Sequence, residues 1–291
     1  MSRDAAHEKR VRRRIFYLAV ATLERPVACF ARTVSGAMSL RFNAFSLTAA
    51  FLVICTAVRA ESPDDLITKG DAFDARLQAA EALQSYLPAL KLQPKNVRLL
   101  VRIARQYRHL LADATTGEEK LRLGSIALEY AQRAAALAPN DSEAQLSIAI
   151  SYGKMLPFMG TKDQMEASRR IKDTVDKAIK LDPRNDLAWH VLGRWHRVLS
   201  DVNTLKRALG SLIYGKLPQT TTEEAVKCFE KAIEINPNRL MHYVELGRAY
   251  AQMGRTVEAR LFIEKGLAMP NVEKDDPETK GRGRETLANL R

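Results

Sequence analysis

The sequence has few cysteines, prolines and glycines, and each shortage excludes a class of protein. Only three cysteines occur among 291 residues, which excludes a fold held together by a disulfide framework. Cys29 and Cys55 lie in the first 60 residues, so Cys228 stands alone in the remainder, on an apolar helix face typical of a small buried hydrophobe. Eleven prolines and 14 glycines are too few for a disordered or fibrous chain. The 46% of hydrophobic residues suffice for one elongated domain or two compact ones.

Motifs of catalysis and metal binding are missing as well. The chain has no HExxH, GxSxG, Walker or CxxC pattern, and no glycine-rich loop that could cradle a phosphate. His190 and His196 lie six residues apart, whereas neighbours on one helix face are three or four apart. We therefore predict that the protein is not an enzyme and binds no metal and no cofactor.

Positive charge is concentrated near the N-terminus. The formal charge is +12, of which residues 1–60 contribute +7 and the remaining 231 residues +5. A nucleic-acid-binding domain carries a basic patch of its own. We therefore expect no nucleic acid among the partners of the body of the chain.

The segment 38–60 has the three-part layout of a secretory signal peptide. Met38 is followed by a basic residue at Arg41, an apolar run over 44–58, and small residues at Val58 and Ala60. This run is shorter than the ~20 residues that a membrane-spanning helix needs. We expect cleavage near Ala60 and export, periplasmic or secreted, with residues 1–37 an over-extended start and 61–291 the mature domain.

Two other interpretations of the leader stay open. The segment 44–58 could remain uncleaved as a membrane anchor. Residues 1–37 are rich in arginine, as in a mitochondrial presequence, but Asp4, Glu8 and Glu24 argue against that interpretation.

Beyond residue 60 the chain is punctuated by prolines at regular places. Pro94, Pro139, Pro183 and Pro237 each follow an Ala-rich or Leu-rich segment, and an asparagine comes directly or one residue after each. Proline just after an apolar periodic segment ends a helix. No stretch shows alternating β-branched residues, so the expected class is all-α.

Residues upstream of the prolines repeat at fixed distances. Small, aromatic and small residues precede two of the prolines by twelve, eight and five positions: Ala225, Phe229 and Ala232 before Pro237, and Ala82, Tyr86 and Ala89 before Pro94. The preceding helices carry a W-x2-L-G-x2-Y-like pattern: Trp189, Leu192, Gly193 and His196, and again Tyr243, Leu246, Gly247 and Tyr250. This pattern resembles the tetratricopeptide repeat (TPR). We predict a TPR-like right-handed α-solenoid of about five hairpins, at 63–96, 97–140, 141–184, 186–238 and 240–271, with a capping helix near 277–290.

The fourth hairpin carries an insertion with a helical pattern of its own. Its apolar residues recur at helical spacing, opposite Lys206 and Arg207: Leu205, Ala208, Leu209, Leu212 and Ile213. The segment Thr220–Thr222 with Glu223 and Glu224 then predicts a capping-box start of the next helix. The extra helix is expected either to plug the solenoid or to cover a groove as a lid.

Four short elements resemble the regulator of microtubule dynamics family. They are L-G-R-W at Leu192–Trp195, the insertion ending at Ile213–Pro218, T-x-E-E-A at Thr221–Ala225, and Met159–Lys162. The resemblance implies a TPR-like fold without catalytic residues. In eukaryotic members it also implies association with microtubules, mitochondria or endoplasmic reticulum. It therefore adds a cytoplasmic or cytoskeletal location, with tubulin as partner, as the alternative to export.

In the TPR fold, positions 2, 5, 9, 12 and 13 of each first helix line the concave groove. By that register the groove would carry a broken row of guanidinium groups: Arg98, Arg105, Arg108, Arg194, Arg197 and Arg248. The first hairpin differs and offers Asp71 and Asp74. Arginine suits the bidentate capture of carboxylates and phosphates.

These residues define the functional hypotheses. The first is a scaffold that holds an acidic or extended segment of a partner protein in the groove. The second is a protein that binds a phospholipid or small anionic ligand, with the inserted helix as lid, which requires a closed apolar cavity of about several hundred Å³. The arginines could also be solvated or internally paired, or they could contact an acidic face of a second copy.

Overall fold

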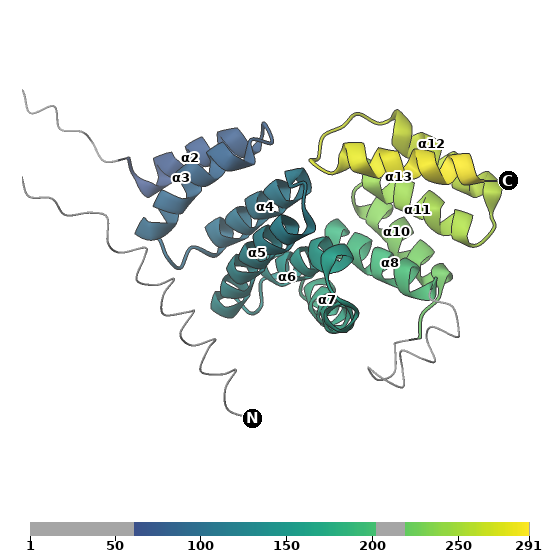
Figure 1. Ribbon diagram of the computed structural model, residues 1–291, viewed down its shortest axis with the longest axis horizontal. Helices are drawn as coiled ribbons and strands as arrows, with labels where there is room; N and C mark the ends of the chain where they lie inside the picture. The colour runs from purple at the N-terminus through teal and green to yellow at the C-terminus, as the bar shows by residue number, and fades with distance from the viewer. Residues whose placement is uncertain (1–60, 202–218, 291) are drawn as a thin grey trace, which may run out of the picture. The chain divides into compact units, whose positions relative to one another are not determined.

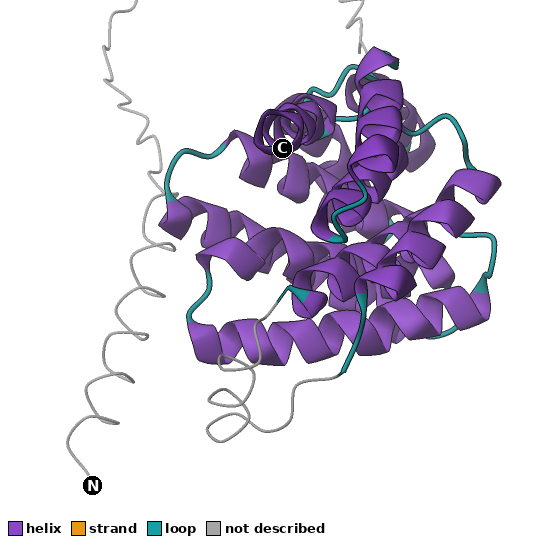
Figure 2. Cartoon of the chain, turned by 90° about the vertical axis from the view of Figure 1, so that its right-hand side faces the viewer, coloured by secondary structure: helices purple, strands orange, loops and turns teal. Residues whose placement is uncertain are grey.

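The computed structural model describes residues 61–201 and 219–290, and all of them lie in one compact unit, residues 58–291. The predicted leader and the predicted inserted helix at 205–213 lie outside the described residues. Within the described ranges the chain forms eleven α-helices and one short 3-10 helix, and it has no strand (Figures 1 and 2). The all-α prediction is confirmed for this part of the chain.

Consecutive helices pair into five hairpins, followed by a closing helix (Figure 1). The pairs are α2 (Pro63–Asp74) with α3 (Ala79–Leu92), α4 (Val97–Asp113) with α5 (Gly117–Leu137), α6 (Ser142–Met155) with α7 (Thr161–Leu181), α8 (Asp186–Ser200) with α10 (Thr222–Ile235), and α11 (Leu240–Gln252) with α12 (Thr256–Ala268). The 3-10 helix η1 (Leu156–Phe158) follows α6, and α13 (Asp276–Asn289) closes the stack. The predicted hairpins and capping helix are confirmed.

Side-chain caps fix where several helices begin. Asn96, Asp141 and Asn185, which follow the predicted helix-stopping prolines, each accept a hydrogen bond from the backbone N–H three residues on. Thr221 does the same and forms a reciprocal capping box with Glu224, as predicted. Each such cap satisfies a backbone donor that the helix itself leaves unpaired. The local sequence therefore sets where the second, third and fourth hairpins begin.

Close packing of small against large residues holds the fourth and fifth hairpins together. A Cβ added at Gly193 would lie 2.8 Å from the Phe229 ring, so glycine is needed where the two helices of the fourth hairpin meet. In the fifth hairpin Ala259 and Leu246 are 0% exposed and Tyr243 is 3% exposed. Tyr250 is buried as well, which confirms the predicted register of this repeat.

Cys228 is buried in the second core cluster, and burial raises the pKa of its thiol to about 12. It is therefore a small buried hydrophobe, as predicted.

Candidate functional site

The six predicted groove arginines lie on three first helices, but their environments differ. Arg98, Arg105 and Arg108 are on α4, Arg194 and Arg197 on α8, and Arg248 on α11. Arg98 is exposed. Arg105 is exposed and forms an ion pair with Asp74 of α2. The first hairpin therefore neutralises part of the predicted basic row.

Arg108 is not presented to an open groove, and the prediction is wrong in this respect. Its side chain is only 7% exposed. Its Nη1 donates hydrogen bonds to Ser147 Oγ at 2.9 Å and to Ser151 Oγ at 3.2 Å, both on α6. No carboxylate contacts this guanidinium among the described residues, and burial lowers its pKa to about 10. Arg108 therefore joins α4 to α6.

The remaining arginines converge on one buried carboxylate that the repeat pattern did not single out. Glu245 of α11 is 0% exposed. Its carboxylate lies 3.2 Å from Arg197 Nε, 2.9 Å from Arg248 Nη1 and 3.4 Å from Arg282 Nε of α13. Burial alone would raise the pKa of Glu245. The guanidiniums of Arg194, Arg197, Arg248 and Arg282 outweigh this effect and hold the pKa well below its ordinary value.

We call Glu245 with its four arginines the arginine cage. It carries four positive charges and one negative charge. Arg197 and Arg248 are thus internally paired, as one of the alternative interpretations expected. Arg194 is the exception, since it forms no ion pair or hydrogen bond with any described residue and is exposed.

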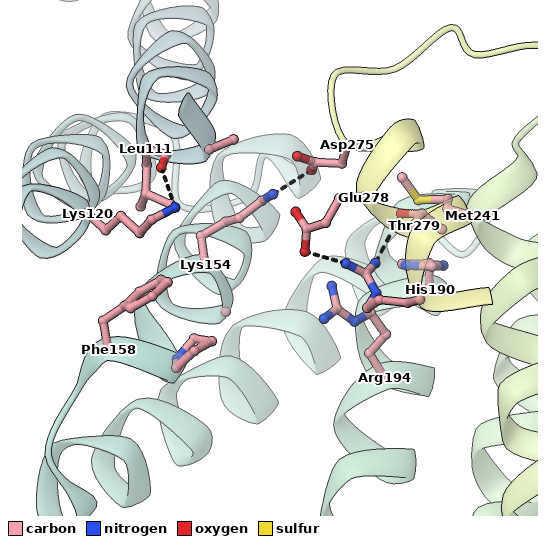
Figure 3. Close-up of a pocket in the computed structure, with 14 residues that line it drawn as sticks. Leu111, Lys120, Lys154, Phe158, His190, Arg194, Met241, Asp275, Glu278 and Thr279 are labelled. Atoms are coloured by element: carbon pink, nitrogen blue, oxygen red, sulfur yellow. Dashed lines mark hydrogen bonds and ion pairs between the residues drawn. The ribbon is translucent and has the colours of Figure 1, made fainter. Parts of the chain in front are cut away.

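Arg194 lines a cavity of about 200 Å³, whose wall comes from the second and third hairpins, from α8 of the fourth, and from α11 and α13 (Figure 3). The charged residues of its wall are Lys120, Lys154, Arg194, Arg282, Asp275 and Glu278. Leu111, Phe158 and Met241 add apolar surface. Lys120 Nζ donates to the carbonyl oxygen of Leu111 at 3.3 Å. The cavity is therefore polar and has more cations than anions.

A chain of buried polar groups starts at this cavity. His190 lines the cavity and its Nδ1 lies 3.0 Å from Nδ1 of His242. His242 Nε2 lies 3.0 Å from the carboxylate of Asp186, which also pairs with Arg239 at 3.0 Å. One imidazole must donate and the other accept across the Nδ1–Nδ1 contact. Burial first, and then His242 and Arg194, lower the pKa of His190 well below its ordinary value, so its ring is neutral near pH 7.

The loop that leads into α13 crosses to helices of the second and third hairpins. Lys274 Nζ lies 2.7 Å from Asp113 at the end of α4, and Asp275 lies 2.6 Å from Lys154 Nζ of α6. Glu273 lies 2.9 Å from Arg239 Nη1. The Asp276 carboxylate accepts hydrogen bonds from the backbone N–H groups of Val272 and Glu273 and so shapes the turn. We call residues 272–278 the clasp; Figure 1 shows its path beside the end of α4.

Two further features are missing from the described residues. They contain no group of three or more His, Cys, Asp or Glu side chains placed to hold a metal ion. None of the helices in the described ranges is both long and apolar enough to cross a membrane.

The helical hairpins define a TPR-like repeat protein. A solved structure supports this class: TTC0263, a thermophilic TPR protein of Thermus thermophilus, is similar with a TM-score of 0.57 and 18% identity, over 78% of this chain and 100% of that one. The family model of Regulator of microtubule dynamics protein 1-3 matches residues 66–291, and the chain belongs to this family.

Relatives of known name agree with this family assignment. Regulator of microtubule dynamics protein 2 of Homo sapiens is 26% identical over 200 residues, which is 67% of this chain and 48% of the relative. Regulator of microtubule dynamics protein 1 of Caenorhabditis elegans is 25% identical over 178 residues, 61% of this chain and 78% of the relative. The chain spans about half the length of the protein 2 relatives.

Proposed function

We propose that this family member is a non-catalytic scaffold that binds an acidic segment of a partner protein in the groove beside Arg194. The observation that supports this most is the surplus of guanidinium groups in the arginine cage. Glu245 offsets one of four positive charges, and Arg194, exposed at the cavity wall, has no ion pair among the described residues. A carboxylate that enters there meets a cation whose hydrogen-bonding groups are still available.

The names of the relatives suggest one class of partner. Because these proteins are named regulators of microtubule dynamics, the acidic tails of tubulin are the partner we propose for a chain that meets tubulin. For an exported chain, the same groove would take an acidic segment of another protein. The phospholipid alternative has less support, because a cavity of about 200 Å³ with six charged wall residues is small and polar for a lipid site.

The test measures binding of a fluorescein-labelled decaglutamate peptide by fluorescence anisotropy. Arg194→Gln should weaken binding several-fold, and the wild-type affinity should fall as salt rises. Arg248 is a poor choice for charge reversal, because a new carboxylate would lie beside buried Glu245 and disturb the fold.

Lys177→Gln provides the matched control. This lysine is exposed on α7 and forms no ion pair among the described residues, and its loss changes the net charge by the same amount. If Arg194→Gln and Lys177→Gln bind the peptide equally well, the groove is not the binding site.

A further inference from the structure

The clasp is itself an acidic segment that lies against the proposed binding groove. Residues 273–278 read Glu-Lys-Asp-Asp-Pro-Glu, with four carboxylates in six positions. Asp276 is buried and serves the turn. Asp275 and Glu278 are different, because both line the cavity that Arg194 also lines.

These two carboxylates contact cations of the cavity wall. Asp275 accepts from Lys154 Nζ of α6 at 2.6 Å (Figure 3). Glu278 forms an ion pair with Arg282 one turn further along α13 itself. Burial alone would raise the pKa of Asp275. Lys154, His109 and Arg194 outweigh this effect and lower the pKa below its ordinary value, so the carboxylate stays ionised. Arg194 lies near the same carboxylate without a direct ion pair, and thus has room for a second anion.

The contacts that hold the clasp are of a kind that another anion can replace. The side chains of the Lys154–Asp275 pair are 22% and 30% exposed, and those of the Lys274–Asp113 pair 22% and 56%. Both carboxylates are partly open to solvent, so salt and a competing anion weaken these pairs. The helix α13 behind the clasp has better anchors: Thr279 is 2% exposed, and Gly283 packs against Val244 and Ile263. Residues 272–275 of the clasp can therefore move while α13 stays in place, and Glu278, in the first turn of α13, can leave Arg282 by rotation of its exposed side chain.

We propose that the clasp is an internal ligand of the groove, and that an acidic partner segment binds by displacing Asp275 and Glu278 from Lys154 and Arg282. This inference rests on the proposed function. It defines the partner more closely, as a short segment with carboxylates three positions apart, the spacing of Asp275 and Glu278. It also implies that the clasp closes the groove in part of the wild-type molecules. The apparent affinity is then the affinity of the open groove multiplied by the fraction of molecules in which the groove is open.

The first experiment removes the internal carboxylates. The variant Asp275→Asn/Glu278→Gln should bind labelled decaglutamate about tenfold tighter than wild type, as expected for a groove that is closed about nine-tenths of the time. The control Glu264→Gln/Glu285→Gln removes the same charge from exposed positions of α12 and α13 that form no ion pair among the described residues. Its affinity should stay within about twofold of wild type.

A second variant opens the clasp without touching the cavity wall. Asp113→Asn removes the partner of Lys274 and should also tighten binding, by less than the double variant. Displacement can be seen directly in wild type by hydrogen exchange. The amides of Val272 and Glu273, which donate to Asp276, should exchange faster when decaglutamate saturates the groove.

The outcomes separate the two proposals. If wild type binds the peptide through Arg194 but the clasp variant binds no tighter than its control, or if the two amides exchange no faster, the clasp is not an internal ligand and the groove proposal stands. If no variant binds the peptide, both proposals fail. Urea midpoints equal to that of wild type show that a change of affinity does not come from loss of folding.

Discussion

Replacing Glu245 with glutamine would remove one negative charge from the interior and change the volume hardly at all. The amide oxygen could still accept a hydrogen bond from Arg248. The four guanidiniums of the arginine cage would lose their counter-ion, however, and the side chains of Arg197, Arg248 and Arg282 are only 14%, 19% and 23% exposed. Water can therefore replace the lost carboxylate only in part.

The magnitude follows from the distances. Two unit charges about 4 Å apart attract by about 4 kcal/mol at an effective dielectric constant of about 20. Three arginines lie closer than that to Glu245, at 2.9, 3.2 and 3.4 Å. The desolvation of the carboxylate and the repulsion among the arginines offset much of this attraction. Loss of one partner of a buried charge cluster typically destabilises by about 3–5 kcal/mol, and we expect Glu245→Gln to fall in this range.

Urea denaturation at pH 7 measures the effect, with exposed Glu264→Gln as a control expected within about 0.5 kcal/mol of wild type. The pKa of Glu245 is lowered by folding, so its contribution is present above the unfolded pKa near 4.5 and is lost as the pH falls below it. The difference between wild type and Glu245→Gln should shrink over that range.

A double-mutant cycle gives the sharpest refutation. Arg248→Gln should destabilise the wild-type protein, but in the Glu245→Gln background it should be neutral or stabilising, because it then relieves repulsion. If Arg248→Gln has the same effect in both backgrounds, or if Glu245→Gln alone is silent, the cage does not stabilise the fold.

Three further predictions concern other parts of the chain. Ala259→Leu should overpack the fifth hairpin and lower the unfolding free energy by about 1–3 kcal/mol, whereas Leu261→Ala, at a side chain that is 60% exposed, should change it little; equal urea midpoints would contradict the register. Burial lowers the pKa values of His190 and His242 from 6.5, so the unfolded state takes up more protons below that pH; the unfolding free energy should fall between pH 7.5 and 5.5, and a constant value would contradict this. The leader pattern predicts a mature protein that begins near Glu61, and mass spectrometry of native material that finds peptides from residues 10–37 would exclude this start.

The hairpins could be predicted because their signals are local. Proline followed by asparagine gives both the end of one helix and the cap of the next, as at Pro94 and Asn96. The spacing of small and aromatic residues gives the contact between paired helices, as at Gly193 and Phe229. Each of these signals lies within one repeat, so one sequence suffices to find it.

The charge pairing could not be predicted in the same way, because it joins different repeats. The groove positions are defined within each repeat, but at two junctions position 12 of one first helix contacts position 6 of the next. Arg108 reaches Ser147 in this way, and Arg197 reaches Glu245. Position 6 is not among the groove positions, so the repeat pattern did not single out Glu245. A glutamate between Val244 and Leu246 on an apolar helix is nevertheless a sequence signal for a buried, paired carboxylate.

No pattern within the repeats predicts the contacts that the C-terminal residues make with the arginine cage and with the earlier hairpins. Arg282 comes from the closing helix, whose register against α11 is not part of the repeat pattern. The clasp joins the last hairpin to the closing helix, and its contacts with Asp113 and Lys154 cross several hairpins. Only the folded arrangement brings these residues together.

The clasp also bears on how the stack of hairpins folds. An array of repeats that contact only their neighbours can unfold from an end, one hairpin at a time. Here Lys274 and Asp275 connect the last loop to α4 and α6, helices far away in the sequence. If the end of the chain separates from the stack, it also breaks contacts in the middle, so fraying of the last hairpin is coupled to the second and third. Contacts of such long sequence range slow folding, because a large loop must close before they form. The described hairpins should therefore unfold with more cooperativity than an open array of the same length.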